Sequence, residues 1–235
     1  MGESILTQNK PEVSAAKKAR AKWLANYTRK WILGLLWLAI PNAIANVLTT
    51  NTYLSSIDLF NNIGCIIGYL CAIVEIFFLI KLRQDEDEYF QCALFGMGAI
   101  ITYGISEVMY RIDASGLYLG WLFFEGVAVV LSCLRMYHEC SAHATVIYSV
   151  DDDIAKKWLG LWKWQVIGSA GTFVGSLLLI YQRLDRVLIT VRIGLFLGTV
   201  MLVVSGIAAI FRMIYLEQSA KAMREYEKYY TSYNS

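Results

Sequence analysis

The stretch that decides the fold is residues 58–82, which read DLFNNIGCIIGYLCAIVEIFFLIKL. Between Asp58 and Lys81 the one charged residue is Glu75, and most of the other residues are apolar. A helix that crosses a membrane needs about 20 mostly apolar residues, and this stretch is long enough. Similar segments on either side predict six crossings, with five or seven as alternatives because the last is long and Pro41 interrupts the first. The five further segments are 31–50, 89–111, 117–137, 161–182 and 188–216.

Composition excludes an ordinary soluble domain. Of the 235 residues, 57% are hydrophobic and 17% are charged, whereas soluble domains are about 45–50% apolar and about 25% charged. The net charge of +2 is too small to indicate a nucleic-acid partner. The sequence therefore predicts an all-α integral membrane protein in contact with the lipid bilayer.

Lysine and arginine are distributed unevenly among the predicted loops and helix ends. If the N-terminus is cytoplasmic, the cytoplasmic segments hold all but four of the 21 Lys and Arg residues. The four on the other side are Arg111, Arg183, Arg186 and Arg192. Because cytoplasmic loops carry an excess of basic residues, we expect a multi-pass protein of the cell membrane with both termini in the cytoplasm.

The chain divides into a basic segment (1–30), a six-span membrane domain (31–216) and a helical tail (217–235). Nothing before Trp31 resembles the apolar core of a signal peptide. Lys and Arg stand beside Trp23 and Tyr27 in the first segment, which suits an interfacial helix on anionic lipid. A basic flank with an aromatic belt, which needs no specific lipid, explains the same pattern.

The fourth and sixth predicted crossings begin with related pentapeptides. Residues 116–120 read GLYLG and residues 194–198 read GLFLG, an offset of 78 positions. At the same offset, residues 137–144 (YHECSAHA) align with residues 215–222 (YLEQSAKA). The second crossing joins at an offset of 52, which places Gly64 over Gly116. This pattern predicts an internal repeat, although shared membrane composition accounts for part of the likeness.

The repeat favours a six-helix bundle of three tandem hairpins in the same orientation, 31–82, 89–137 and 161–216, around a pseudo-threefold axis. Small residues let helix backbones approach closely in lipid. We therefore expect the second, fourth and sixth crossings to meet near their outer ends, which would leave the bundle wider toward the cytoplasm. The glycines predicted to make this contact are Gly64, Gly68, Gly116, Gly120, Gly194 and Gly198.

Three acidic residues lie inside predicted crossings: Glu75, Glu107 and Glu125. A charge at the centre of a membrane helix costs about 2.5–3.5 kcal/mol on insertion scales, so such residues are candidates for a functional site. We expect no Lys or Arg at the same depth to pair with them. They suit a proton or cation site, and the alternative is a neutral acid that bonds a neighbouring helix or aids assembly.

Pro41 predicts an interruption of the first crossing, since proline removes one backbone hydrogen bond from a helix. Asn42 and Asn46 lie four residues apart and share a helix face. A broken helix with polar residues at mid-depth is typical of substrate sites in transporters. A simple kink, with asparagine satisfying the freed backbone groups, is the alternative.

The loop before the fifth crossing contains His138, Cys140, His143 and the run 151–153 (DDD). The histidines are five residues apart on different helix faces, so we predict no metal site, and the aspartates favour the start of the next helix. The five cysteines do not suggest a disulfide framework. We find no catalytic motif, and we predict neither an enzyme nor a cofactor.

The sequence therefore favours a non-enzymatic membrane protein that binds or conducts a small solute or ion. The candidate ligand residues are Glu125, Glu75, Glu107, Asn42 and Asn46. The alternative is a structural or accessory subunit of a larger membrane complex, which would use its small-residue helix faces and cytoplasmic segments to hold another protein.

Overall fold

The computed structural model of the chain describes residues 10–50, 57–111, 118–185 and 188–232. Apart from residue 57 and two short turns, these residues are helical. The helices are α1 (Lys10–Trp23), the π-helical turn η1 (Leu24–Thr28), α2 (Arg29–Thr50), α4 (Asp58–Leu82), α5 (Glu88–Arg111), α6 (Tyr118–Tyr148), α7 (Asp152–Asp185) and α8 (Leu188–Ser232).

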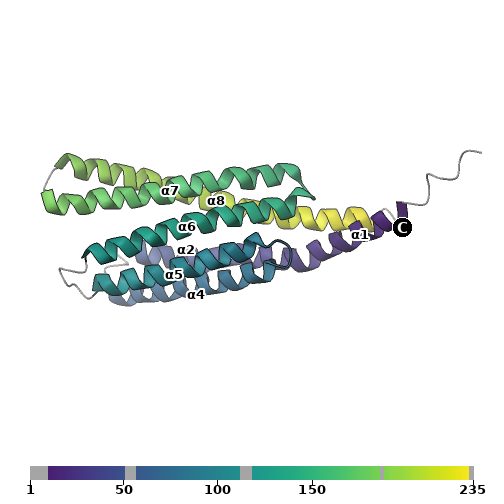
Figure 1. The fold of residues 1–235 in the computed structure, drawn as a ribbon, viewed down its shortest axis with the longest axis horizontal. Coiled ribbons are helices and arrows are strands. Elements are labelled where there is room, and N and C mark those ends of the chain that lie inside the picture. Colours follow the sequence, from purple (N-terminus) through teal and green to yellow (C-terminus); the bar gives the residue numbers. More distant parts are fainter. Residues whose placement is uncertain (1–9, 51–56, 112–117, 186–187, 233–235) are drawn as a thin grey trace, which may run out of the picture.

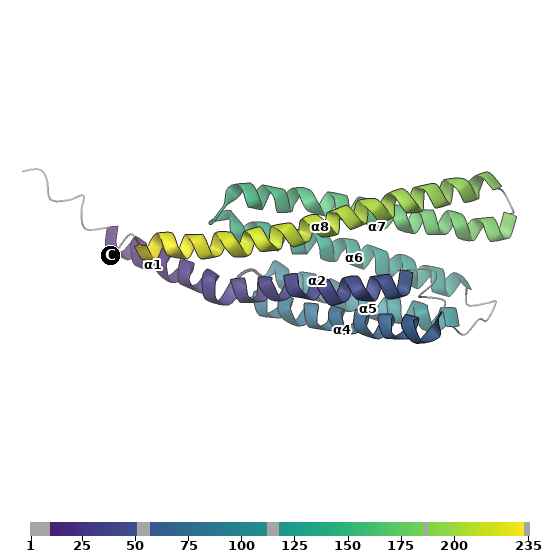
Figure 2. The ribbon, with the colours of Figure 1, turned by 180° about the vertical axis from the view of Figure 1, so that it is seen from behind.

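The six long helices lie side by side and alternate in direction (Figure 1). Each packs against the next in the chain, and α8 also packs against α2, so the contacts close a ring. Figure 2 shows α2 and α8 along this closure. We call the end where α2, α5 and α7 finish the distal end. The opposite end, which α1 and the last turns of α8 extend, is the proximal end (Figure 1).

Five helical stretches among the described residues are long and apolar enough to cross a membrane. They are Ala15–Thr49, Asp58–Leu82, Glu88–Met109, Gly120–Tyr148 and Arg192–Tyr230. α7 (Asp152–Asp185), the remaining long helix, contains the predicted segment 161–182. Many large apolar side chains face outward, and those of Leu59, Phe123 and Phe196 are more than half exposed. The architecture is that of a multi-pass helical membrane protein, and the crossing at 161–182 remains a prediction.

The glycines of the sequence repeat pack within pairs of consecutive helices. A Cβ atom on Gly64 would lie 2.8 Å from the Cβ of Leu48 on α2, and one on Gly120 would lie 3.4 Å from the Met109 sulfur on α5. A Cβ atom on Gly198 would meet nothing within 4 Å, but the Cα of Gly198 would lie 2.8 Å from a Cβ on Gly175 of α7. The expectation that these glycines join the second, fourth and sixth crossings at one end is therefore wrong for the described residues. The antiparallel neighbour in the chain takes the close contact instead.

Gly116 lies outside the described residues, and the remaining glycines follow the same pattern. Gly68 has Ala45 of α2 as its neighbour, and the carbonyl of Gly194 faces Gly175 of α7. These contacts do not test the internal repeat or the threefold axis, which stay predictions.

The first crossing is not interrupted. α2 runs from Arg29 to Thr50 with Pro41 inside it, so the discontinuous helix is wrong, and the alternative of a continuous helix that contains the proline agrees with the structure. Proline is tolerated within membrane helices because neighbouring groups satisfy the freed backbone carbonyl. The departure from α-helical geometry comes earlier, at η1, where a π-helical turn joins α1 to α2 without a loop.

The aromatic residues before the first crossing bind the protein itself. The carboxylate of Asp85, in the turn between α4 and α5, accepts hydrogen bonds from Arg20 (3.0 Å), the Trp23 indole (2.8 Å) and the Thr28 hydroxyl (2.6 Å). Trp23 and Thr28 are five residues apart, and a π-helical turn brings such residues to one face. The α1–η1 segment is thereby fixed to the proximal end of the bundle.

The proximal ends of α7 and α8 are also anchored. The Asp151 side chain accepts a hydrogen bond from the Ile154 backbone N–H at 3.0 Å, which confirms that the aspartate run starts this helix. α8 continues unbroken past residue 216 and packs against α1. There the Trp158 indole donates to the Ser219 hydroxyl at 3.0 Å, and Met223 is fully buried.

Candidate functional site

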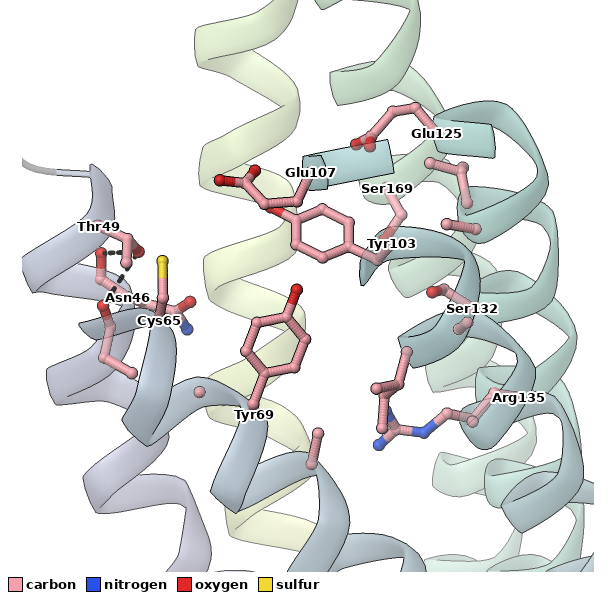
Figure 3. Close-up of a pocket in the computed structure, with 18 of the residues that line it drawn as sticks. Asn46, Thr49, Cys65, Tyr69, Tyr103, Glu107, Glu125, Ser132, Arg135 and Ser169 are labelled. Atoms are coloured by element: carbon pink, nitrogen blue, oxygen red, sulfur yellow. Dashed lines mark hydrogen bonds between the residues drawn. The ribbon is translucent and has the colours of Figure 1, made fainter. Parts of the chain in front are cut away.

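A cavity of about 700 Å³ lies between α2, α4, α5 and α6 in the distal half of the bundle (Figure 3). Its volume falls within the range of small-molecule sites, about 300–1,000 Å³. Glycines and alanines on the facing helices leave this space open. The polar residues of the wall are Asn46, Thr49, Asn61, Cys65, Tyr69, Tyr103, Glu107, Glu125, Ser132, Arg135 and Ser169.

Small residues form part of the wall of this cavity, among them Gly64, Gly68 and Ala99. The cavity makes the bundle wide in its distal half. Because the side of the membrane on which this end lies is a prediction, the expected widening toward the cytoplasm also stays a prediction.

Two of the predicted acidic residues reach the cavity from different helices. Glu107 comes from α5 and Glu125 from α6, and Figure 3 places both near Tyr103, away from Arg135. The Glu125 carboxylate accepts a hydrogen bond from the Ser106 hydroxyl at 3.0 Å. The structure thus places two carboxylates from neighbouring helices at one cavity.

Two tyrosines that the sequence did not single out share the cavity wall. The ring centroids of Tyr69 and Tyr103 lie 6.5 Å apart with an interplanar angle of 51°, and both rings point into the cavity (Figure 3). Tyr103 precedes Glu107 by four residues, so the helix period could have placed it on the same face. Tyr69 carries no comparable signal.

Four charged side chains from three helices form an ion cluster at the proximal end of the cavity. Glu75 of α4 lies 2.5 Å from a guanidinium nitrogen of both Arg135 (α6) and Arg212 (α8). Arg212 also donates through Nε to Glu139 of α6 at 2.7 Å, and Arg135 lies 3.9 Å from Glu139. These two carboxylates and two guanidinium groups balance in formal charge.

The expectation that Glu75 has no basic partner is wrong. From the predicted crossings, Arg135 and Arg212 lie near the cytoplasmic ends of their helices, where arginine usually extends its side chain toward water. Both instead turn toward the centre of the bundle, and their side chains are only 23% and 19% exposed. The length of the arginine side chain lets it reach a carboxylate on another helix.

A second cavity, of about 120 Å³, lies beside the ion cluster between α2, α4, α6 and α8. Asn42 and Glu75 line it, together with Cys71 and Arg212. Arg135 lines both cavities. The five predicted ligand residues are therefore divided. Asn46, Glu107 and Glu125 line the large cavity, and Asn42 and Glu75 line the small one.

The two histidines occupy separate aromatic contacts. The His143 ring is stacked on Trp158 with centroids 4.4 Å apart, and its Nδ1 lies 2.7 Å from the Tyr89 hydroxyl. His138 stacks on Phe95 at 5.3 Å. Neither lines a cavity described above. His143 belongs to the proximal core, where Leu79, Leu82, Tyr89, Cys92 and Leu216 are fully buried.

No protein-family model, no curated protein and no solved structure matches this chain.

Proposed function

We propose that the chain is a membrane protein that binds a small organic cation in the large distal cavity and conducts it through the bundle. It catalyses no covalent step. The observation that carries the proposal is the meeting of Glu125, Glu107 and two tyrosine rings in a cavity of about 700 Å³ between membrane-length helices.

The charge balance of the cavity wall favours a cation. Arg135 is the one Lys or Arg among the described residues that line the cavity, and Glu75 and Glu139 offset its charge within the ion cluster. The carboxylates of Glu107 and Glu125 then make the electrostatic potential in the cavity negative. A carboxylate away from water is costly, and a bound cation lowers that cost.

The tyrosines favour an organic cation over a bare metal ion. A cation within about 6 Å of an aromatic face is attracted to the ring, and quaternary ammonium groups are often recognised in this way. Tyr69 and Tyr103 offer two such faces. The hydroxyl and amide groups of Ser132 and Asn46 can serve a polar substituent of the same solute.

We also propose that the proximal end lies in the cytoplasm, so that the cavity opens toward the outside of the cell. Exposed lysines at this end support the orientation, among them Lys17 and Lys22 on α1 and Lys221 on α8. The lysines on α1 can contact anionic lipid headgroups. In intact cells, Lys221→Cys in a protein whose five native cysteines are replaced should react with an impermeant maleimide only after the membrane is permeabilised, and reaction beforehand would contradict this orientation.

The binding proposal is tested with choline and its neutral isostere, 3,3-dimethyl-1-butanol. Choline should raise the midpoint of thermal unfolding of the purified protein, because a ligand that binds only the folded state stabilises it. The isostere should not. Glu125→Gln should weaken choline binding at least tenfold, and Glu217→Gln, on an exposed face of α8, should leave it unchanged.

Two results would contradict the proposal: equal stabilisation by choline and its isostere, or choline binding that Glu125→Gln does not alter. Conduction is measured separately as uptake of radiolabelled choline into proteoliposomes. Binding without uptake would overturn conduction, and a membrane protein that co-purifies in stoichiometric amount would then favour the accessory-subunit alternative.

A further inference from the structure

The ion cluster lies where a path from the large cavity to the proximal end would pass. Arg135 lines both cavities, and Glu75 and Arg212 line the small one. Past the cluster, the bundle is filled by fully buried side chains, among them Leu82 and Leu216. A solute in the large cavity therefore meets charged side chains first and packed apolar side chains after them.

The cluster also ties together three helices that are separated in the chain. Glu75 on α4 forms salt bridges with Arg135 on α6 and with Arg212 on α8. Arg212 also donates a hydrogen bond to Glu139 on α6. At the distal end these helices instead pack against α2, α5 and α7, as the glycine contacts show. The salt bridges of the ion cluster therefore join α4, α6 and α8 across the centre of the bundle, at the depth of Glu75.

Stability alone does not explain four charges at this position. Removing two ion pairs from water is costly, and well-packed apolar residues often stabilise a protein equally or better. In a salt bridge, unlike an apolar contact, each charged group can exchange its partner for another ion of the same charge. A cation that approaches Glu75 competes with the two guanidinium groups, so the contact can open in response to the solute.

We infer that the ion cluster of Glu75, Arg135, Glu139 and Arg212 is the barrier that closes the cavity toward the proximal end and opens during conduction. This inference rests on the proposed function, since a barrier needs a path to close. The Glu75–Arg135 pair holds α4 to α6 where the two cavities meet, and its separation joins the small cavity to the large one.

Two native cysteines report on the two sides of Arg135. Cys65 lines the large cavity and Cys71 lines the small one, and neither forms a disulfide. In purified proteins that keep one of these cysteines, a cationic methanethiosulfonate reagent should modify Cys65 readily. Cys71 is 6% exposed and should react at least tenfold more slowly.

The double variant Glu75→Gln/Arg212→Gln removes the salt bridges of Glu75 to Arg135 and Arg212 and that of Arg212 to Glu139. It keeps the charge balance, since Arg135 and Glu139 remain. It should increase the rate of Cys71 modification at least tenfold and leave the Cys65 rate within about twofold. The matched control is Asp152→Asn/Lys156→Gln, which removes an exposed pair on α7 and should change neither rate.

The inference is overturned if Cys71 reacts as fast as Cys65 in the unaltered cluster, or if a folded double variant leaves the Cys71 rate unchanged. Should the double variant fail to fold, Glu75→Asp keeps the charge and shortens the side chain. It should then raise the Cys71 rate, and an unchanged rate overturns the inference. Choline protection of Cys65 reports on solute binding, so a failed binding proposal and a failed barrier give different results.

Discussion

Asp85 is the residue on which the α1–η1 segment depends. Its side chain is fully buried, and its carboxylate accepts hydrogen bonds from Arg20, Trp23 and Thr28. A hydrogen bond to a charged group contributes about 1.5–3 kcal/mol, and an unpaired buried donor is costly. Asp87, two residues on, has a side chain that is 88% exposed.

Asp85→Asn should therefore destabilise the protein by about 2–4 kcal/mol, because the amide group faces donors where the carboxylate accepted from them. Asp87→Asn is the matched control and should stay within about 0.5 kcal/mol of the unaltered protein. Chemical unfolding in mixed micelles measures both. Equal stability of the two variants would show that the three hydrogen bonds do not hold α1.

At the scale of single residues, the sequence located the acidic side chains but not their partners. Residue type and distance from the helix ends are enough to select Glu75, Glu107 and Glu125. Which of them meets an arginine depends on the direction in which Arg135 and Arg212 extend, and that direction is set by packing between helices. Glu75 became part of the ion cluster for this reason, and Glu125 stayed in a cavity.

At the scale of elements, α7 and α8 make the closest backbone approach described here. A Cβ atom on Gly175 would lie 2.8 Å from the Cα of Gly198, and one on Gly168 would lie 3.0 Å from the backbone nitrogen of Ser205. Backbone atoms cannot move aside as a flexible side chain can. Gly160, earlier on the same helix, is exposed and has no neighbour within 4 Å of such an atom.

Gly175→Ala should push α7 away from α8 and destabilise the protein by about 1–3 kcal/mol, as overpacking does. Gly160→Ala should instead stabilise α7 by about 0.5–1 kcal/mol, because glycine is unfavourable in a helix. Thermal unfolding in detergent compares the two. A similar midpoint for both variants would mean that the helices separate without cost.

Helix positions were easier to predict than helix neighbours. Apolar length placed the segments, and Asp151 marked the start of α7, because both signals are local in the chain. The π-helical turn at Leu24–Thr28 has no such signal, since it follows from the bonds that Trp23 and Thr28 make to Asp85. The glycines indicated close contact correctly, but the helices that the repeat assigned to these contacts were wrong.

At the scale of the whole molecule, the last turns of α8 complete the proximal end. Ser219 accepts a hydrogen bond from the buried Trp158 indole, and Ala220 and Met223 belong to the core. The sequence predicts residues 217–235 as a helical tail that runs on from the last crossing, and it leaves open whether the tail docks on the bundle. The structure continues the helix to Ser232 and packs it against α1.

A chain that ends at residue 216 should therefore lose stability, because Trp158 loses its acceptor and the buried faces of α1 and η1 become exposed. We expect its unfolding midpoint in detergent to fall by more than 5 °C, on the order of a few kcal/mol for a protein of this size. Removal of residues 233–235 alone is the control and should have no effect. An unchanged midpoint for the shorter chain would make the α8 extension dispensable.

The place of Arg212 in the last helix has a consequence for biosynthesis. Ribosomes deliver the N-terminal helices first, so Glu75, Arg135 and Glu139 enter the membrane before α8 is translated. Until then, two carboxylates face one guanidinium, and the nascent protein carries an unbalanced negative charge among apolar helices. Insertion of the final helix supplies the missing positive charge, which makes completion of the polypeptide the step that locks the earlier helices together.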